Sequence, residues 1–161
     1  MRTATVHELK KELASLPPAE LLEICLRLAK YKKDNKELMT FLLFEAHDLQ
    51  GYAEGVREEI RTQMKELSSS PYLMKKGLRK ILRMTNKYIR YAGSKETEVE
   101  LLLYWCTQVR EAAVPLHRNT QLANLFGQQV KKIQKAVASL HEDLQYDYLR
   151  SLKALEAGGH F

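Results

Sequence analysis

The residues with the clearest chemical potential in this sequence are seven cations gathered between positions 71 and 93. This run contains no Asp or Glu, whereas the other nineteen basic and twenty acidic residues of the chain almost cancel. Five of the cations follow a four-three-four-three spacing, which places them in one stripe along a helix. They are Lys76, Lys80, Arg83, Lys87 and Arg90. Such a stripe can bind phosphates, because Lys and Arg displace the counterions that surround a polyanion.

The same stripe has an interpretation without a ligand. Both flanking segments are rich in glutamate, at positions 54, 58, 59 and 66 before the run and at 96, 98 and 100 after it. Pairing within the molecule or simple solvation would then use the cations, and surface ion pairs contribute little each. We favour this interpretation and keep an anion-binding site at the five residues as the alternative.

No catalytic or metal-binding pattern is recognisable. Two short clusters combine histidine with carboxylates, at positions 45–48 and 141–143. However, a di-metal helical bundle requires Glu-x-x-His pairs on facing helices, and zinc sites on one helix require histidines four residues apart. Glycine-rich phosphate loops and a GxSxG motif are also absent from the sequence. We therefore predict no catalytic residue, no metal ligand and no cofactor, and an enzyme is the less favoured class.

The elements that carry these residues are expected to be helices. A capping box of Thr5 and Glu8 opens a first helix that ends near Ser15, and Pro17 and Pro18 open a second that reaches about Lys32. These two helices are expected to form a hairpin with its own core. A second capping box is predicted at positions 34 and 37. The apolar positions that follow it have near-heptad spacing, which predicts one long helix over residues 36–67.

Gly51 and Gly55 lie inside this predicted long helix. Their spacing is that of a membrane dimer motif, but charged surroundings favour the close approach of a neighbouring helix instead.

Three further helical regions follow. One runs to Gly93, where glycine is expected to end it, and Ser94 is expected to cap the next. In that next helix Leu101, Leu103 and Trp105 widen the apolar stripe to an arc of roughly 200°. This arc predicts self-association or a helical partner. After Pro115, residues 120–155 keep helical spacing and form either one helix or two.

Composition agrees with one helical domain. Of 161 residues, only seven are Gly and four are Pro, which is too little turn chemistry for a fold of many short strands. We predict an all-α fold, a compact bundle of about six helices with one long helix over a single domain, residues 1–161. A short α-solenoid is the alternative. Cys25 and Cys106 are expected to be buried. The longest apolar stretch, residues 38–44, is too short to cross a membrane, and we expect a cytoplasmic protein.

The N-terminal segment ThrValHisGluLeuLysLysGluLeu, followed by a second helix, resembles the small SAP module of DNA-binding proteins. The resemblance covers about thirty residues and implies DNA binding by a helix-turn-helix hairpin. However, Leu16, Pro17 and Pro18 stand where that module generally has a glycine-containing connection. We therefore prefer a hairpin with a structural role.

Two segments resemble small uncharacterised helical proteins of bacteria. One is residues 21–46, which begins LeuLeuGluIleCysLeu, and the other is residues 78–91, LeuArgLysIleLeuArgMetThrAsnLysTyrIleArgTyr. The resemblance covers about two thirds of the chain. It implies a helical fold and a bacterial cytoplasmic setting, and it carries over no activity and no functional residue.

Two functions therefore stand as expectations. The first is a non-enzymatic helical interaction or scaffold protein, because the sequence has extensive apolar helical faces and no convergent reactive groups. Its partner is another protein or a second copy. The alternative is a module that binds nucleic acid or another polyanion through the basic helix.

Overall fold

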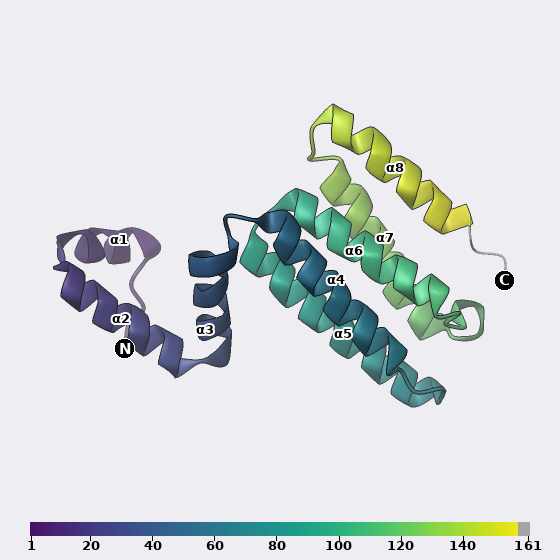
Figure 1. Cartoon of the computed structure of the whole chain (residues 1–161), viewed down its shortest axis with the longest axis horizontal. Coiled ribbons are helices and arrows are strands. Elements are labelled where there is room, and N and C mark those ends of the chain that lie inside the picture. The colour runs from purple at the N-terminus through teal and green to yellow at the C-terminus, as the bar shows by residue number, and fades with distance from the viewer. Residues whose placement is uncertain (158–161) are drawn as a thin grey trace. The chain divides into compact units, whose positions relative to one another are not determined.

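The structure is a computed structural model in which residues 1–157 are described. These residues form eight α-helices and no strand, which confirms the all-α class (Figure 1). The helix count exceeds the predicted six because the predicted long helix is divided and because residues 120–155, for which one helix or two were expected, form two. By its internal contacts the chain divides into two compact units, Met1–Phe44 and Glu45–Phe161. The expectation of a single domain over residues 1–161 stays a prediction.

The first unit contains α1 (Val6–Ser15), α2 (Pro18–Tyr31) and α3 (Lys33–Thr40). The capping box of Thr5 and Glu8 is present, since the Thr5 hydroxyl accepts from the Glu8 amide and the Glu8 carboxylate accepts from the Thr5 amide. The second predicted capping box is wrong, because α3 begins after Lys32 without a side-chain cap.

No residue of α1, α2 or α3 is buried. The prediction that Cys25 is buried is therefore wrong, and the predicted hairpin has no core of its own. The physical reason is that three short helices are too few to enclose an apolar stripe, although α2 and α3 contact each other.

The predicted long helix over residues 36–67 is also wrong. A π-helical turn, η1 (Phe41–Glu45), follows α3, and α4 (Leu49–Lys65) begins only after Asp48. The Asp48 carboxylate accepts from the Gly51 amide 2.9 Å away and so caps a new helix. A Cβ atom at residue 51 would collide with that carboxylate, which explains the glycine. Nothing lies within 4 Å of a Cβ built at Gly55, so the predicted close approach of a neighbouring helix is absent there.

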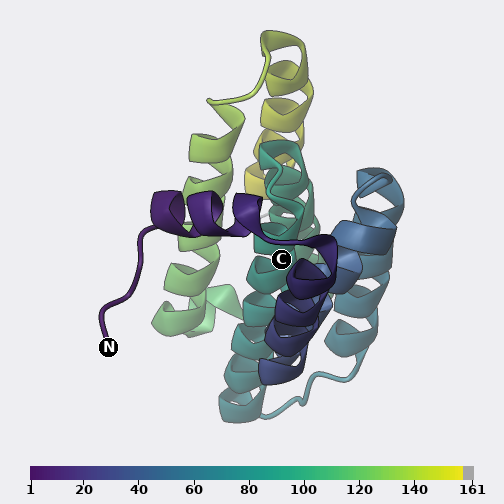
Figure 2. The same ribbon diagram turned by 90° about the vertical axis from the view of Figure 1, so that its left-hand side faces the viewer.

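The second unit contains α4, α5 (Pro71–Ala92), α6 (Lys95–Glu111), the short 3-10 helix η2 (Leu116–Arg118), α7 (Thr120–Val137) and α8 (Glu142–Ala157). Helix α6 contacts α4, α5, α7 and α8, and it is the centre of this unit. The region 120–155 forms two helices, and α8 returns alongside α7 (Figures 1 and 2). The expected end of α5 at Gly93 and the expected cap of α6 at Ser94 are confirmed, and the Asn119 side chain caps α7.

The apolar arc of α6 faces the inside of this unit. Leu101 and Trp105 are 0% and 1% exposed, and Leu103 is half-buried. Cys106 is buried beside them, as predicted. The arc therefore serves the core of the unit, and it is not the surface for self-association that the sequence suggested. No helix of residues 1–157 combines the length and the apolar composition needed to cross a membrane.

Candidate polyanion-binding face

The predicted stripe lies on the outer side of α5. This helix turns its apolar side inward through Leu78, Ile81, Leu82, Thr85 and Ile89, which recur every three or four residues and are buried. The cations fall on the opposite side, because they occupy the intervening positions of the same helical repeat. Lys76, Lys80, Arg83 and Arg90 are exposed, and Lys87 is half-buried. Arg79, which the stripe predicted from the sequence leaves out, is exposed on the same side.

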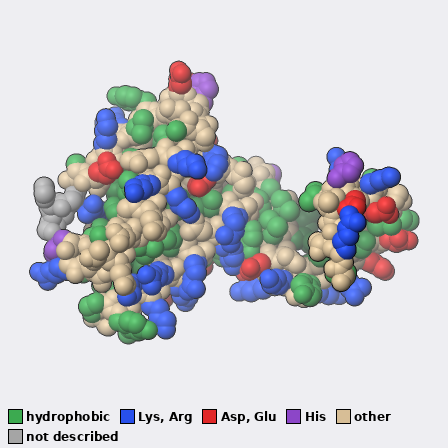
Figure 3. Space-filling view, turned by 180° about the vertical axis from the view of Figure 1, so that it is seen from behind, with side chains coloured by type: hydrophobic (Ala, Val, Ile, Leu, Met, Phe, Trp, Pro, Cys, Tyr) green, Lys and Arg blue, Asp and Glu red, His purple; other side chains and the backbone are tan. Residues whose placement is uncertain are grey.

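The face is free of acidic side chains along most of its length. Within residues 1–157, no carboxylate lies within ion-pair distance of Lys76, Lys80, Arg83 or Arg90. Figure 3 shows Lys and Arg side chains gathered over the second unit with few Asp and Glu side chains among them. We call the outer side of α5 with the five predicted residues and Arg79 the basic face.

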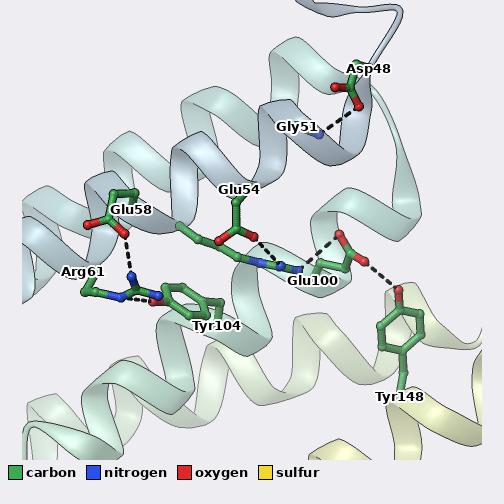
Figure 4. A network of polar contacts seen from close by, with 9 residues as sticks. Asp48, Gly51, Glu54, Glu58, Arg61, Glu100, Tyr104 and Tyr148 are labelled. Carbon is green, nitrogen blue, oxygen red and sulfur yellow. Dashed lines mark hydrogen bonds and ion pairs between the residues drawn. The ribbon is translucent and has the colours of Figure 1, made fainter.

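The glutamates of α4 and α6 are engaged elsewhere, chiefly in a polar network between these two helices (Figure 4). Arg57 pairs with Glu54 at 3.1 Å and with Glu100 at 3.5 Å, and Arg61 pairs with Glu58. The hydrogen bond from Arg61 to the Tyr104 hydroxyl raises the pKa of the Arg61 guanidinium.

Two more glutamates of α6 are also occupied. Tyr148 donates to both Glu96 and Glu100, with oxygens 3.3 Å apart in each case. Glu98 pairs with Lys95 at 2.7 Å. These contacts occupy Glu54, Glu58, Glu96, Glu98 and Glu100 with partners other than Lys76, Lys80, Arg83 and Arg90.

A pocket of about 750 Å³ opens at the C-terminal end of the basic face. Arg83, Lys87 and Arg90 of the predicted stripe line it. Lys95 from α6 and Lys132 from α7 complete a set of five cations around it, and Glu98 is the one carboxylate in the lining. Lys76 and Lys80 lie nearer the N-terminal end of α5, outside the pocket. The pocket is thus lined by three of the five residues of the predicted stripe.

The start of α6 adds polar groups to this pocket. Gly93 ends α5 in the left-handed conformation, with φ of 61°, and Ser94 caps α6 by accepting from the Thr97 amide. Both residues line the pocket, so the N-terminal end of α6 is directed toward it. A helix N-terminus carries a partial positive charge, which favours an anion, although acidic side chains in the first turn of α6 offset part of it.

Lys95 and Lys132 were missed by the sequence reasoning. Lys95 directly follows the predicted cap at Ser94 and could have been found as an extension of the basic run. Lys132 lies forty-two residues beyond Arg90, and only the packing of α7 beside α5 brings it to the pocket.

In each of the two clusters of histidine and carboxylate, the contacts join residues two or three positions apart. Asp48 caps α4, and His141 lies 3.4 Å from Asp143 at the start of α8. Within the described part of the chain, no group of three or more His, Cys, Asp or Glu side chains is placed to hold a metal ion.

Comparison with known proteins adds no relative from which a function could be transferred. No protein-family model, no curated protein and no solved structure matches this chain.

Proposed function

We propose that this chain is a binding protein that holds the phosphate backbone of a nucleic acid on the basic face and in the pocket at its end. The observation that carries this proposal is the row of four exposed cations on α5, at positions 76, 80, 83 and 90, without a carboxylate at ion-pair distance among the described residues. Cations that are solvated and unpaired can exchange their counterions for phosphates, and the released counterions drive binding.

The shape of the basic face favours a linear polyanion. Lys76 and Arg90 are fourteen residues apart on one helix, which corresponds to about 21 Å. One strand of a nucleic acid presents a phosphate about every 3.4 Å along the duplex axis, so a row of this length would lie beside several phosphates. A single small anion would engage only one part of the row.

The composition of the basic face favours nucleic acid over an acidic protein. Protein interfaces obtain most of their binding energy from apolar and aromatic side chains near their centre. The outer side of α5 offers no apolar side chain between Lys76 and Arg90, and exposed Tyr72 and Leu73 lie before the row. Contacts to phosphate need no such apolar centre.

The test is a salt series on paired variants. The probes are a labelled DNA duplex of about 20 base pairs and a labelled RNA strand of similar length, with salt varied from about 50 to 200 mM. The wild-type chain should lose affinity steeply as salt rises. The double variant Lys80→Gln/Arg83→Gln should bind more weakly, and its slope of log affinity against log salt should be shallower by about 1.8 on duplex DNA.

The matched control is Lys10→Gln/Lys11→Gln, which removes two exposed cations from α1. This variant should retain the wild-type slope. Absence of binding at low salt, or equal slopes for the two double variants, would end the proposal.

A second candidate function is that of a helical interaction or scaffold protein, and a different observation favours it. Most of the large apolar side chains that are exposed in residues 1–157 belong to the first unit, from Val6 in α1 to Phe44. Exposed apolar surface of this extent is typical of a protein contact.

A further inference from the structure

The pocket at the end of the basic face carries more positive charge than one phosphodiester neutralises. Its five cations come from three helices, α5, α6 and α7, and Glu98 is the one carboxylate among the described residues that line it. Lys95 pairs with that carboxylate at 2.7 Å. Five cations against one carboxylate give the lining a net charge of +4. A group with two negative charges therefore gains more from this pocket than a group with one.

Three of these cations are arranged in a way that suits a phosphate group. Arg83 and Arg90 lie seven residues apart on α5, which is about two helical turns, so they project from the same side of the helix. Each guanidinium can donate two parallel hydrogen bonds to phosphate oxygens. Lys132 donates to the amide oxygen of Asn86 at 3.3 Å, and this contact holds its ammonium group at the pocket. Three cationic side chains match a phosphate with three free oxygens, one more than a phosphodiester has.

The position of the pocket indicates the end of a strand. The row of cations runs along α5 from Lys76 and stops with that helix, because Gly93 adopts φ of 61° and the chain turns into α6. Arg83 and Arg90 belong both to the row and to the lining of the pocket. A strand whose phosphates follow the row therefore reaches the pocket where the row ends.

The end of a nucleic-acid strand differs from its interior in charge. Each internal phosphate is a diester with one negative charge. A terminal phosphate is a monoester, which carries about −1.5 to −2 charges at pH 7 and has three free oxygens. The terminal phosphate is thus the part of a strand that best matches the charge of the pocket.

We propose that the pocket holds the terminal phosphate of a nucleic-acid strand whose following phosphates lie along the basic face. The protein then binds a strand end that carries phosphate more tightly than an end that carries a hydroxyl group. This inference rests on the proposed function, because the row supplies the contacts to the rest of the strand.

A free mononucleotide has the same terminal phosphate, but the pocket suits it less well. The volume of about 750 Å³ would admit a nucleotide. However, sites for small molecules are lined mainly by apolar and aromatic side chains, and Ile89 has the only apolar side chain among the described residues that line this pocket. A free nucleotide would therefore be held by its phosphate alone, whereas a strand adds the contacts of the row.

The experiment compares strands that differ only at their ends. The probes are single DNA strands of about eight nucleotides, slightly longer than the row, with a fluorescent label on an internal nucleotide. One strand has a phosphate at its 5′ end, one has a phosphate at its 3′ end, and one has hydroxyl groups at both ends. In fluorescence anisotropy, the wild-type chain should bind at least one phosphorylated strand about tenfold more tightly than the hydroxyl strand, which is the effect of one added hydrogen bond between charged groups.

Two double variants separate the pocket from the row. Arg90→Gln/Lys132→Gln removes two cations of the pocket and should abolish most of the preference for phosphate. Lys76→Gln/Lys80→Gln is the matched control, because both lysines are exposed cations of the basic face outside the pocket. It should weaken the binding of all three strands by the same factor and keep the tenfold preference. Circular dichroism should show unchanged helix content in both variants.

The outcomes distinguish this inference from the proposed function. Equal affinities for the three strands, with the steep salt dependence of phosphate contacts, would overturn the terminal-phosphate site and leave the proposed function intact. A preference that persists in Arg90→Gln/Lys132→Gln would also overturn it. Thymidine monophosphate should compete with the phosphorylated strand only near a millimolar or above, and competition at about a micromolar would assign the pocket to a free nucleotide instead. Absence of binding to any strand would overturn both proposals.

Discussion

The Nζ atom of Lys132 lies 3.3 Å from the Oδ1 atom of Asn86, and this contact joins α7 to the side of α5 that lines the basic pocket. Asn86 lies one helical turn from Arg83 and from Arg90. Its amide oxygen therefore holds a cation from a distant part of the chain next to the predicted stripe.

If the pocket binds phosphate, removing this lysine should change the salt dependence of binding. Lys132→Gln should make the slope on duplex DNA shallower by about 0.9, since one phosphate contact is lost. Asn86→Ala should weaken binding less, because Lys132 stays present but is no longer held. Lys131→Gln, on the same helix but outside the pocket lining, should behave as the wild type. Fluorescence anisotropy across the salt series measures all three variants, and a Lys131→Gln effect equal to that of Lys132→Gln would contradict the assignment.

Two glycines should respond to alanine in opposite directions. Gly93 has φ of 61°, so Gly93→Ala should destabilise the protein by about 1 kcal/mol through the backbone alone, because no atom obstructs the added Cβ. Gly55 is helical and equally unobstructed, and Gly55→Ala should stabilise by roughly 0.5–1 kcal/mol. Urea unfolding gives both values, and effects of the same sign would show that the backbone argument is wrong.

Cys106 should make stability depend on alkaline pH. Burial raises the pKa of its thiol to about 12. In the unfolded chain the thiol titrates near 8.5, so the unfolded state releases a proton that the native state keeps. The contribution is complete below about pH 8.5 and is lost as pH rises toward 12, by up to about 1.4 kcal/mol per pH unit.

The readout is the difference in unfolding free energy between the wild type and Cys106→Ala, measured in urea at about pH 8 and about pH 10.5. Other groups titrate alike in both chains, so the advantage of the wild type should shrink as pH rises. A constant difference would mean that the thiol is not shielded from solvent in the folded protein.

The hydroxyl of Tyr148 should help to hold α8 on α6. It donates toward Glu96 and Glu100, and burial, followed by these two carboxylates, raises its pKa. Tyr148→Phe should cost about 1 kcal/mol at neutral pH, the typical net value of a hydrogen bond. Tyr146→Phe is the control, since Tyr146 lies on the same helix and is 71% exposed. Thermal unfolding should separate the two variants, and equal melting temperatures would remove this role.

Local signals in the sequence determined the helices and most of their ends. The capping box at Thr5, the glycine at 93 and the caps at Ser94 and Asn119 are interactions between residues a few positions apart, so the sequence contains all their parts. For the same reason the spacing within α5 was sufficient to place the five cations on one side of that helix.

Only the tertiary structure decided what each face meets. The wide apolar arc of α6 was predicted to face a partner, yet it is enclosed by α4, α5, α7 and α8, because burial depends on how many neighbours the topology supplies. The spacing of apolar residues also could not predict that the long helix is divided, because an Asp at position 48 can either continue a helix or cap a new one. Lys132 reaches the pocket only through the packing of α7, a long-range contact that the spacing of residues along the chain does not contain.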